Sequence, residues 1–577
     1  EEAERKEREA KEEAERKERE AKEEAERQAR EAAESAVRQE ERWAEEELQR
    51  REEVRRQRDA EAANYPPEWE GLRPPPARGV FVPHTTGRPK VGEWKPQLAQ
   101  LPPHLRKITP FDEHLKAKPQ KEFDAEMDKI KDEGPIGHFY GLRFPYTYEM
   151  IQRYGKEFLT KALHKAGTMP KDNYITKMET ETFVGGSMAL KCFISVEYAK
   201  PDENLHTQLF MKYPFPASNG HERKTVYISR FLLNNDGPEL DFARILSAGA
   251  PMRCPKYYFG DICLKTGTCI LITEKLTLPP ADANFGPYEF EPVPYKSVDY
   301  LLENPFWYYD SMTRNIATLA AWGKSGKFGK DIMEIFPPPQ HPAAYFMGTK
   351  KRVEMFLWFL CENATMLVPP EIRDEEFGRS MHELLPEVER CQKEILDYLF
   401  EKSDYCGFTH QNMNTDNAIF WRDEKGKLES GFIDWGRFKQ DNFARGLSNG
   451  YMCTDLSEFL QENDNRLIRN YIAEFMAEGG PAVEFDTFWE HYMLSWLLLG
   501  LSAVDLPRQI FMCGSKHVVP EAWPFIHDYK DPRVFTMPNY NNGMVAIVRN
   551  FAYYWKVKDL AGFWNRWKKV HLPKKFK

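Results

Sequence analysis

The pattern of hydrophobic and polar positions divides the chain into three parts. Residues 1–63 are almost entirely charged residues and alanine, and residues 64–137 are interrupted by prolines. From about residue 138, apolar residues recur with the spacings of helices and strands up to the C-terminus. Only this third part has the pattern of a packed globular body, because a core needs apolar side chains at helical or strand periods.

The first part repeats with a period of eleven residues. Residues 1–11 read EEAERKEREAK, and residues 12–22 repeat them. Acid-then-base pairs four residues apart, such as Glu1 and Arg5, each stabilise a helix by about 0.2–0.5 kcal/mol. No glycine or proline interrupts residues 1–63, so the pattern predicts one charged helix, roughly 95 Å long. An eleven-residue repeat with only alanine on its stripe favours a lone helix over a strong coiled coil.

The second part, residues 64–137, is predicted to be an extended strap. Its prolines are dense up to Pro119, which excludes a long helix and disfavours a central strand. Aromatic residues such as Trp69 and Trp94 are interleaved with them, and a free linker has no need of tryptophan. We therefore expect the strap to lie on a surface, either that of its own body or that of a partner. The charged helix and the strap are the segments through which we expect the chain to bind a protein partner.

The globular part reads first as strands and then mainly as helices, which predicts an α+β fold. A stretch of thirteen apolar and small residues at 492–504 is too short for a membrane helix of roughly 20 residues, so we expect a buried core helix. The predicted strands cover 181–200, as two strands joined by a glycine turn, 206–215 and 269–276, and the predicted helices cover 146–167, 238–247, 314–326 and 386–402.

Two short stretches carry the candidate chemistry. Residues 407–421 read GFTHQNMNTDNAIFW, and residues 431–438 read GFIDWGRF. Before them come the glycine turn, a strand that ends near Lys212 and a helix with Glu239 in its first turn. The order and spacing of these pieces resemble the protein-kinase-like superfamily. Within it, the match is to the choline kinase, aminoglycoside phosphotransferase and ecdysteroid-kinase-like branch, over about residues 145–560.

The resemblance implies a bilobal fold behind the helix and strap, with a small antiparallel sheet in an N-lobe (138–278) and a mostly helical C-lobe (279–577). It also implies ATP and Mg²⁺ as cofactors and a small-molecule substrate. Phosphoryl transfer depends more on positioning and charge neutralisation than on covalent help from the protein. The resemblance also implies roles for individual residues. The phosphates would be covered by Gly185, Gly186 and Ser187, and Lys212 would contact the α- and β-phosphates and pair with Glu239. Adenine would be contacted by residues 271–275, which include Thr273 and Glu274, and Mg²⁺ would be held by Asn417 and Asp434.

The chain departs from the branch at the catalytic base. The branch reads His-Gly-Asp in this loop, whereas this chain reads His410-Gln411-Asn412. An asparagine can orient a hydroxyl but is a very poor proton acceptor, and losing a general base costs on the order of 10²–10⁴ in rate. Gln411 adds bulk where we expect a substrate hydroxyl to approach. Asp416 is the less favoured candidate for a substitute base.

Three functions remain open. The favoured one is a kinase-fold protein that binds nucleotide, is catalytically impaired and acts as a subunit of a larger assembly. The second is an active ATP-dependent kinase that phosphorylates a hydroxyl of a choline-like, sugar-like or sterol-like molecule. The third is a structural component that binds no nucleotide.

Composition limits the classes of partner and the cellular compartment that we expect for the protein. The net charge is −9 and the pI near 6.0, which argues against bulk binding of nucleic acid. The nine cysteines are scattered without a C-x-x-C pair, so we expect reduced thiols in a cytoplasmic or similarly reducing compartment. The sequence begins at Glu1 within a repeat, as a fragment of a longer chain would, so a targeting peptide before it stays open.

Overall fold

The computed structural model describes most of the globular part of the chain and scattered positions of the N-terminal helix. Contacts divide the chain into two units, residues 1–65 with 300–305 and residues 66–299 with 306–577. The described residues are 101–110, 120–183, 189–218, 220–227, 236–278, 290–294, 297–302, 304–338, 348–422, 428–455, 457–513, 523–531 and 541–572, together with positions 2, 13, 16, 17, 20, 27 and 534.

The described positions of residues 1–63 are helical. Glu13 pairs with Lys17 at 2.8 Å, and Arg16 pairs with Glu20 at 3.6 Å, both at a spacing of four residues. The rest of the predicted helix lies outside the described residues, as do Trp69 and Trp94 of the strap. The length of the helix therefore stays a prediction, and so does the division into four segments.

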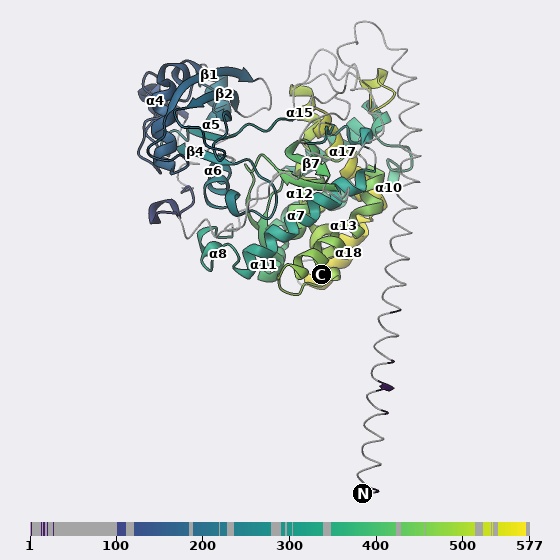
Figure 1. The fold of residues 1–577 in the computed structure, drawn as a ribbon. Coiled ribbons are helices and arrows are strands. Elements are labelled where there is room, and N and C mark those ends of the chain that lie inside the picture. Colours follow the sequence, from purple (N-terminus) through teal and green to yellow (C-terminus); the bar gives the residue numbers. More distant parts are fainter. Residues whose placement is uncertain are drawn as a thin grey trace. The chain divides into compact units, whose positions relative to one another are not determined.

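A five-stranded antiparallel sheet forms the first part of the globular body (Figure 1). Its strands are β1 (Ile175–Phe183), β2 (Leu190–Tyr198), β3 (Gln208–Tyr213), β4 (Tyr257–Ile262) and β5 (Cys269–Glu274). The strand order is β1-β2-β3-β5-β4, so each strand pairs with neighbours of opposite direction. The predicted strands are confirmed, and β4 is an addition to them.

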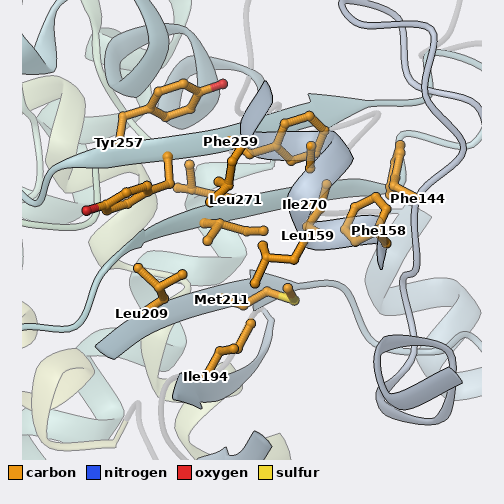
Figure 2. Close-up of a cluster of buried hydrophobic side chains, with 14 of the residues drawn as sticks. Phe144, Phe158, Leu159, Ile194, Leu209, Met211, Tyr257, Phe259, Ile270 and Leu271 are labelled. Atoms are coloured by element: carbon orange, nitrogen blue, oxygen red, sulfur yellow. The ribbon is translucent and has the colours of Figure 1, made fainter. Parts of the chain in front are cut away.

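Helix α4 (Tyr148–Ala166) covers one face of this sheet at its predicted position, but Gly155, with a non-helical φ of 56°, interrupts the single helix that was predicted. Thr147 caps its start by accepting a hydrogen bond from the backbone N–H of Met150, and Gly167 ends it with a φ of 73°. Phe158 and Leu159 of α4 lie among the buried side chains of the strands (Figure 2). Full burial of each such side chain contributes about 1.5–3 kcal/mol. This core makes the sheet a rigid support for groups on its other face.

The prediction of an extended strap is wrong for the last part of the segment. Residues Gln120–Ile130 form helix α3 rather than extended chain. No proline or glycine follows Pro119 until Gly134, and Phe123 and Met127 stand four residues apart, so one face of a helix is apolar. Both side chains are buried in a small cluster with Met150 of α4. The predicted strap boundary at residue 137 is therefore too far along the chain, because the dense prolines end at Pro119.

Residues 101–110, the described part of the strap before helix α3, lie on the chain's own body. They contact helix α6 (Asp236–Ile245), whose predicted position is also confirmed. The backbone N–H and the hydroxyl of Thr109 donate to the carboxylate of Asp241 at 2.8 and 2.9 Å. The guanidinium of Arg244 donates to backbone carbonyls of the same segment. The expectation that the strap lies on a surface is met here.

The helices and strands of the remaining body have the following bounds: α5 (Gly220–Tyr227), α7 (Pro305–Ser325), α8 (Ile332–Ile335), α9 (Thr349–Trp358), α10 (Glu375–Arg390), α11 (Gln392–Glu401), β6 (Cys406–Thr409), β7 (Ala418–Arg422), β8 (Leu428–Phe432), β9 (Lys439–Asn442), α12 (Phe443–Tyr451), α13 (Ser457–Ala477), α14 (Phe485–Ala503), α15 (Leu506–Cys513), α17 (Asn541–Val557) and α18 (Leu560–His571). The segment predicted as one helix at 386–402 is divided at Cys391 between α10 and α11.

This second part of the body is mainly helical, and two antiparallel strand pairs, β6–β9 and β7–β8, carry its loops (Figure 1). No helix of the described residues combines the length and apolar composition needed to cross a bilayer. Helix α14, which contains most of the stretch 492–504, is buried instead, and Trp496 stacks on Tyr554 of α17 at 3.9 Å.

Candidate active site

Two loops of the helical part form the base of the candidate site. Residues 410–417 join β6 to β7, and residues 433–438 join β8 to β9. The backbone N–H of Ile433 donates to the carbonyl of Asn417 at 2.9 Å, which fastens the two loops to each other. Gly431 at the end of β8 has no side chain because the carbonyl of Arg253 lies 2.1 Å from where its Cβ would stand. The strand pairs therefore bring both predicted motifs to one place.

His410 is a positioning residue in this loop. It is fully buried, and one ring nitrogen, Nε2, lies 3.0 Å from the carbonyl of Ile433. The other, Nδ1, accepts the backbone N–H of Asn412 at 3.3 Å. Burial lowers the pKa of His410 to about 4, so the ring is neutral at pH 7. Its contacts hold the backbone of both loops and leave it no role as a proton acceptor toward a substrate.

Asn412 occupies the predicted base position and is half-buried. Its amide oxygen accepts a hydrogen bond from Nδ2 of Asn414 at 2.8 Å. Its backbone carbonyl accepts from Nδ2 of Asn417 at 3.1 Å. The side chain is thus oriented by its neighbours, but its amide cannot take a proton from a hydroxyl at neutral pH.

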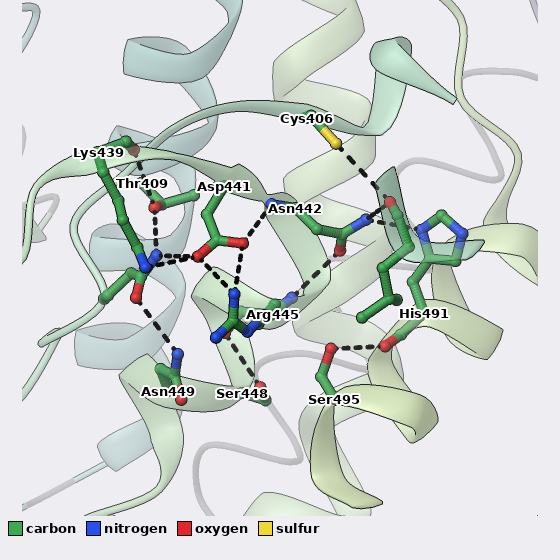
Figure 3. Close-up of polar contacts among 12 residues, drawn as sticks. Cys406, Thr409, Lys439, Asp441, Asn442, Arg445, Ser448, Asn449, His491 and Ser495 are labelled. Carbon is green, nitrogen blue, oxygen red and sulfur yellow. Dashed lines mark hydrogen bonds and ion pairs between the residues drawn. The ribbon is translucent and has the colours of Figure 1, made fainter. Parts of the chain in front are cut away.

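The prediction that Gln411 obstructs the approach of a substrate is wrong. Gln411 is 5% exposed, and Nε2 of its side chain donates to Oδ2 of Asp441 at 2.6 Å. Figure 3 shows Asp441 among its other partners, Lys439 and Arg445. Asp441 is completely buried and also pairs with Lys439 at 3.0 Å and Arg445 at 3.1 Å. Burial alone would raise the pKa of Asp441, but Arg445 and Lys439 lower it to about 2. Gln411 therefore anchors the loop to a buried carboxylate.

Lys212, on strand β3 of the sheet, pairs with helix α6 and with the loop at residues 433–438. Its Nζ lies 2.5 Å from Oε2 of Glu239 on α6 and 3.6 Å from Oδ1 of Asp434 in the second loop. The lysine and glutamate side chains are 18% and 12% exposed. Although burial works in the opposite direction, the nearby carboxylates raise the pKa of Lys212, so it stays charged. The structure brings these three predicted residues together.

Asp434 stands in a backbone conformation that non-glycine residues rarely adopt, with a φ of 57°. The surrounding aromatic residues support it. Trp435, the next residue, stacks on Phe242 of α6 with ring centroids 3.5 Å apart and meets the ring of His410 at 4.5 Å. Helix α6 thus contacts the loop through Phe242 and the sheet through Glu239. Strained positions that the surroundings hold in place cluster at functional sites.

Asn417 and Asp434 fit a magnesium ion only together with phosphate oxygens. Mg²⁺ prefers oxygen ligands and is commonly held by one or two carboxylates and the phosphates of a substrate. The Nδ2 group of Asn417 is used by Asn412, so its amide oxygen is the atom available to a metal. Among the described residues no cluster of three or more histidine, cysteine or acidic side chains could hold a metal by itself.

Asp416 is placed beside these ligands but toward the interior. It belongs to a short 3-10 turn, Thr415–Asn417, and its charge acts on the buried carboxylate of Asp299. Burial first raises the pKa of Asp299 to about 6, and the charge of Asp416 adds to this. The role of Asp416 as a substitute base stays a prediction.

The predicted hinge residues have contacts of their own. Thr273 is paired with Phe210 across β3 and β5, and its hydroxyl donates to the carbonyl of Glu274 at 3.1 Å. The carboxylate of Glu274, 4% exposed, pairs with His206 at 3.0 Å and with Arg253. The carboxylate of Glu274 is therefore a structural anchor, and the contact of residues 271–275 with adenine stays a prediction. Gly185, Gly186 and Ser187 lie outside the described residues, so their predicted role stays a prediction.

One residue of the site was missed by the sequence analysis. Lys191 of β2 is the direct cross-strand partner of Lys212, and directly opposed residues of an antiparallel pair lie on the same face of a sheet. Burial first, and then the charge of Lys212, lower the pKa of Lys191 to about 8. Alternation within the strand places Lys191 on the same face as Phe193, but only the register between β2 and β3 shows that this face also carries Lys212.

Comparison with known proteins gives similarity to solved structures alone. No family model matches the chain, and no curated protein matches it. A choline kinase from Cryptosporidium parvum Iowa II aligns with 70% of this chain and 97% of its own at 12% identity, with a TM-score of 0.33. An ethanolamine kinase from Plasmodium vivax aligns with 71% of this chain and 93% of its own at 12% identity, with a TM-score of 0.32.

An aminoglycoside 2′-phosphotransferase in complex with GDP aligns with 63% of this chain and 95% of its own at 11% identity, with a TM-score of 0.30. The names of these proteins agree with the branch that the motifs resemble. At such low TM-scores and identities, function has to be argued from the contacts of the site.

Proposed function

We propose that the body is a bilobal, protein-kinase-like module that binds a nucleotide with Mg²⁺ but transfers phosphate poorly. The observation that carries this proposal is the position of Lys212, whose Nζ lies within ion-pair distance of both Glu239 and Asp434. A structural ion pair would need only one carboxylate. The second belongs to a strained residue of the loop that also contains the metal-type motif, and this arrangement suits a cation that holds phosphates next to a metal ion.

The face of the sheet that carries Lys212 also offers aromatic rings on which the base of a nucleotide could stack. Two residues before Lys212 on β3 stands Phe210, which is the cross-strand partner of Phe193, with ring centroids 6.3 Å apart. Stacking of a base on an aromatic ring is worth about 1–3 kcal/mol. Aromatic rings and lysines on one face thus offer separate places for a base and for phosphates.

The transfer step is the part that we propose to be impaired. Lys212, Glu239, Asn417 and Asp434 retain the groups that bind and neutralise, and bound Mg²⁺ would neutralise charge on the phosphates. Asn412 is oriented by Asn414 where a proton acceptor is needed, and an amide does not supply one. A general base contributes about 10²–10⁴ to rate. The module therefore suits a nucleotide-binding subunit, with the charged helix and strap as its contacts to partner proteins.

Calorimetric titration of the full-length chain with ATP and Mg²⁺ tests the proposal. We expect saturable binding in the micromolar range for the wild type. Lys212→Met should weaken it by about 10–150-fold, because a hydrogen bond to a charged group is worth about 1.5–3 kcal/mol. Lys200→Met is the matched control, since Lys200 is exposed and pairs with Asp172 at the surface. Wild-type protein that binds no ATP at millimolar concentration would favour the purely structural function.

A further inference from the structure

Lys191 introduces a second positive charge into a site where one lysine already has its partners. Its register partner on β3 is Lys212, and like charges directly opposite each other destabilise a sheet. Lys191 is half-buried, and its Nζ donates to the carbonyl of Ala189 at 3.1 Å. Nothing in the pairing of β2 with β3 requires two lysines at directly opposed positions. The arrangement is therefore better explained by an anionic ligand.

The charges around Lys191 support this view. The carboxylates of Glu239 and Asp434 act on Lys191 as well as on Lys212. Asp236, the first residue of α6, also acts on Lys212. Two lysines thus face three carboxylates, a formal charge of −1, whereas with Lys212 alone the formal charge would be −2 and would repel a polyphosphate more strongly until a metal ion was bound.

We propose that Lys191 is a second phosphate-binding cation, which allows this site to bind the polyphosphate of a nucleotide with little help from a divalent metal ion. This inference rests on the proposed function and deepens it. An ammonium group is a compact charge with three donors on a flexible stem. From β2, Lys191 reaches the face of the sheet that Lys212 shares, so both can contact the same phosphate chain.

The test is the affinity for ATP and for ADP, measured by calorimetry on the full-length chain in EDTA and in Mg²⁺. The wild type should lose less than about tenfold in affinity when Mg²⁺ is removed. Lys191→Met should lose about tenfold or more in EDTA, and most of this loss should be recovered in Mg²⁺. Lys191→Arg should retain binding in EDTA, since it keeps the charge. Lys177→Met on β1 is the control, because Lys177 is exposed and pairs with Glu179.

The outcomes separate this inference from the proposed function. If Lys191→Met binds ATP as tightly as the wild type in EDTA, the inference is wrong and the proposed function stands. If the wild type binds ATP only with Mg²⁺, the inference is also wrong. If the wild type binds no nucleotide under either condition, both are overturned. Loss of fold does not obscure the result, because removing one of two opposed lysines relieves repulsion, and the melting temperature of Lys191→Met should not fall.

Discussion

The side-chain amide of Gln411 donates a hydrogen bond to Oδ2 of Asp441 at 2.6 Å, while the backbone of Gln411 has a φ of 60°. A glutamine in this conformation is strained, by roughly 1–2 kcal/mol relative to ordinary backbone. The hydrogen bond to a buried carboxylate offsets that strain. The loop before Asn412 is thus held by a side chain that a glycine would lack.

Replacing Gln411 by glycine and by alanine separates the two effects. Both changes remove the hydrogen bond to Asp441 and should destabilise the protein, by about 1–3 kcal/mol for the bond alone. Glycine also relieves the positive φ, so Gln411→Gly should be more stable than Gln411→Ala by about 1 kcal/mol. Chemical denaturation of the two variants measures the difference. Equal stability of the variants would show that backbone strain at this position is negligible.

The sequence predicted the elements of the body well and the directions of its side chains less well. Period and end signals located α4, from Thr147 to Gly167, because local rules decide such helices. Whether Gln411 turns toward a substrate or toward Asp441 depends on a contact thirty residues away. The pairing of Lys191 with Lys212 depends on the register of β2 against β3, which the connection between these two strands helps to decide. Neither is present in a local pattern.

Restoring the acid at position 412 should raise turnover. The carboxylate introduced by Asn412→Asp could still accept the hydrogen bond from Asn414, so the loop geometry would be kept. A general base contributes about 10²–10⁴ to rate, and we expect a gain in that range. The measurement is consumption of ATP against a panel of amino-alcohols, sugars and sterols, for the wild type and the variant.

Asn204→Asp is a control for the added charge, since Asn204 lies in a surface turn next to Asp202. It should leave turnover unchanged. High turnover of the wild type, unaffected by Asn412→Asp, would contradict the argument that the missing base limits the reaction. It would favour an active small-molecule kinase instead.

The stability of the sheet should depend on pH through Glu274. Burial alone would raise the pKa of Glu274, but hydrogen bonds from His206 and Arg253 lower it from 4.5 to about 2. A carboxyl whose pKa is lower in the folded than in the unfolded state stabilises the fold above its unfolded pKa. This contribution, about 3 kcal/mol, should be complete above pH 4.5 and disappear as the pH falls toward 2.

Urea denaturation at several values between about pH 2 and pH 7 measures this effect as the difference between the wild type and Glu274→Gln. The difference should be largest near neutral pH and shrink steadily below pH 4.5. Glu181→Gln serves as a control, because Glu181 is an exposed residue of β1. A difference that does not change with pH would mean that Glu274 contributes packing alone.

Helix α6 is shared by the strap and the site, which gives a final prediction. Its Asp241 accepts two hydrogen bonds from Thr109, while its Glu239 holds Lys212 and its Phe242 stacks on Trp435. Thr109→Val removes only the hydroxyl bond at 2.9 Å, and hydrogen exchange at residues 101–110 should become faster.

If α6 transmits this loosening to the site, Glu239 is positioned less firmly and ATP should bind about two- to tenfold more weakly. This range corresponds to a part of the roughly 1.5–3 kcal/mol that the lost hydrogen bond contributes. Thr176→Val is the matched control, since the hydroxyl of Thr176 donates to the carbonyl of Glu197 on an exposed part of the sheet. Faster exchange at residues 101–110 with unchanged affinity for ATP would show that the strap braces the body without acting on the site. A loss of affinity would instead mean that a protein bound to the strap could change nucleotide binding through α6.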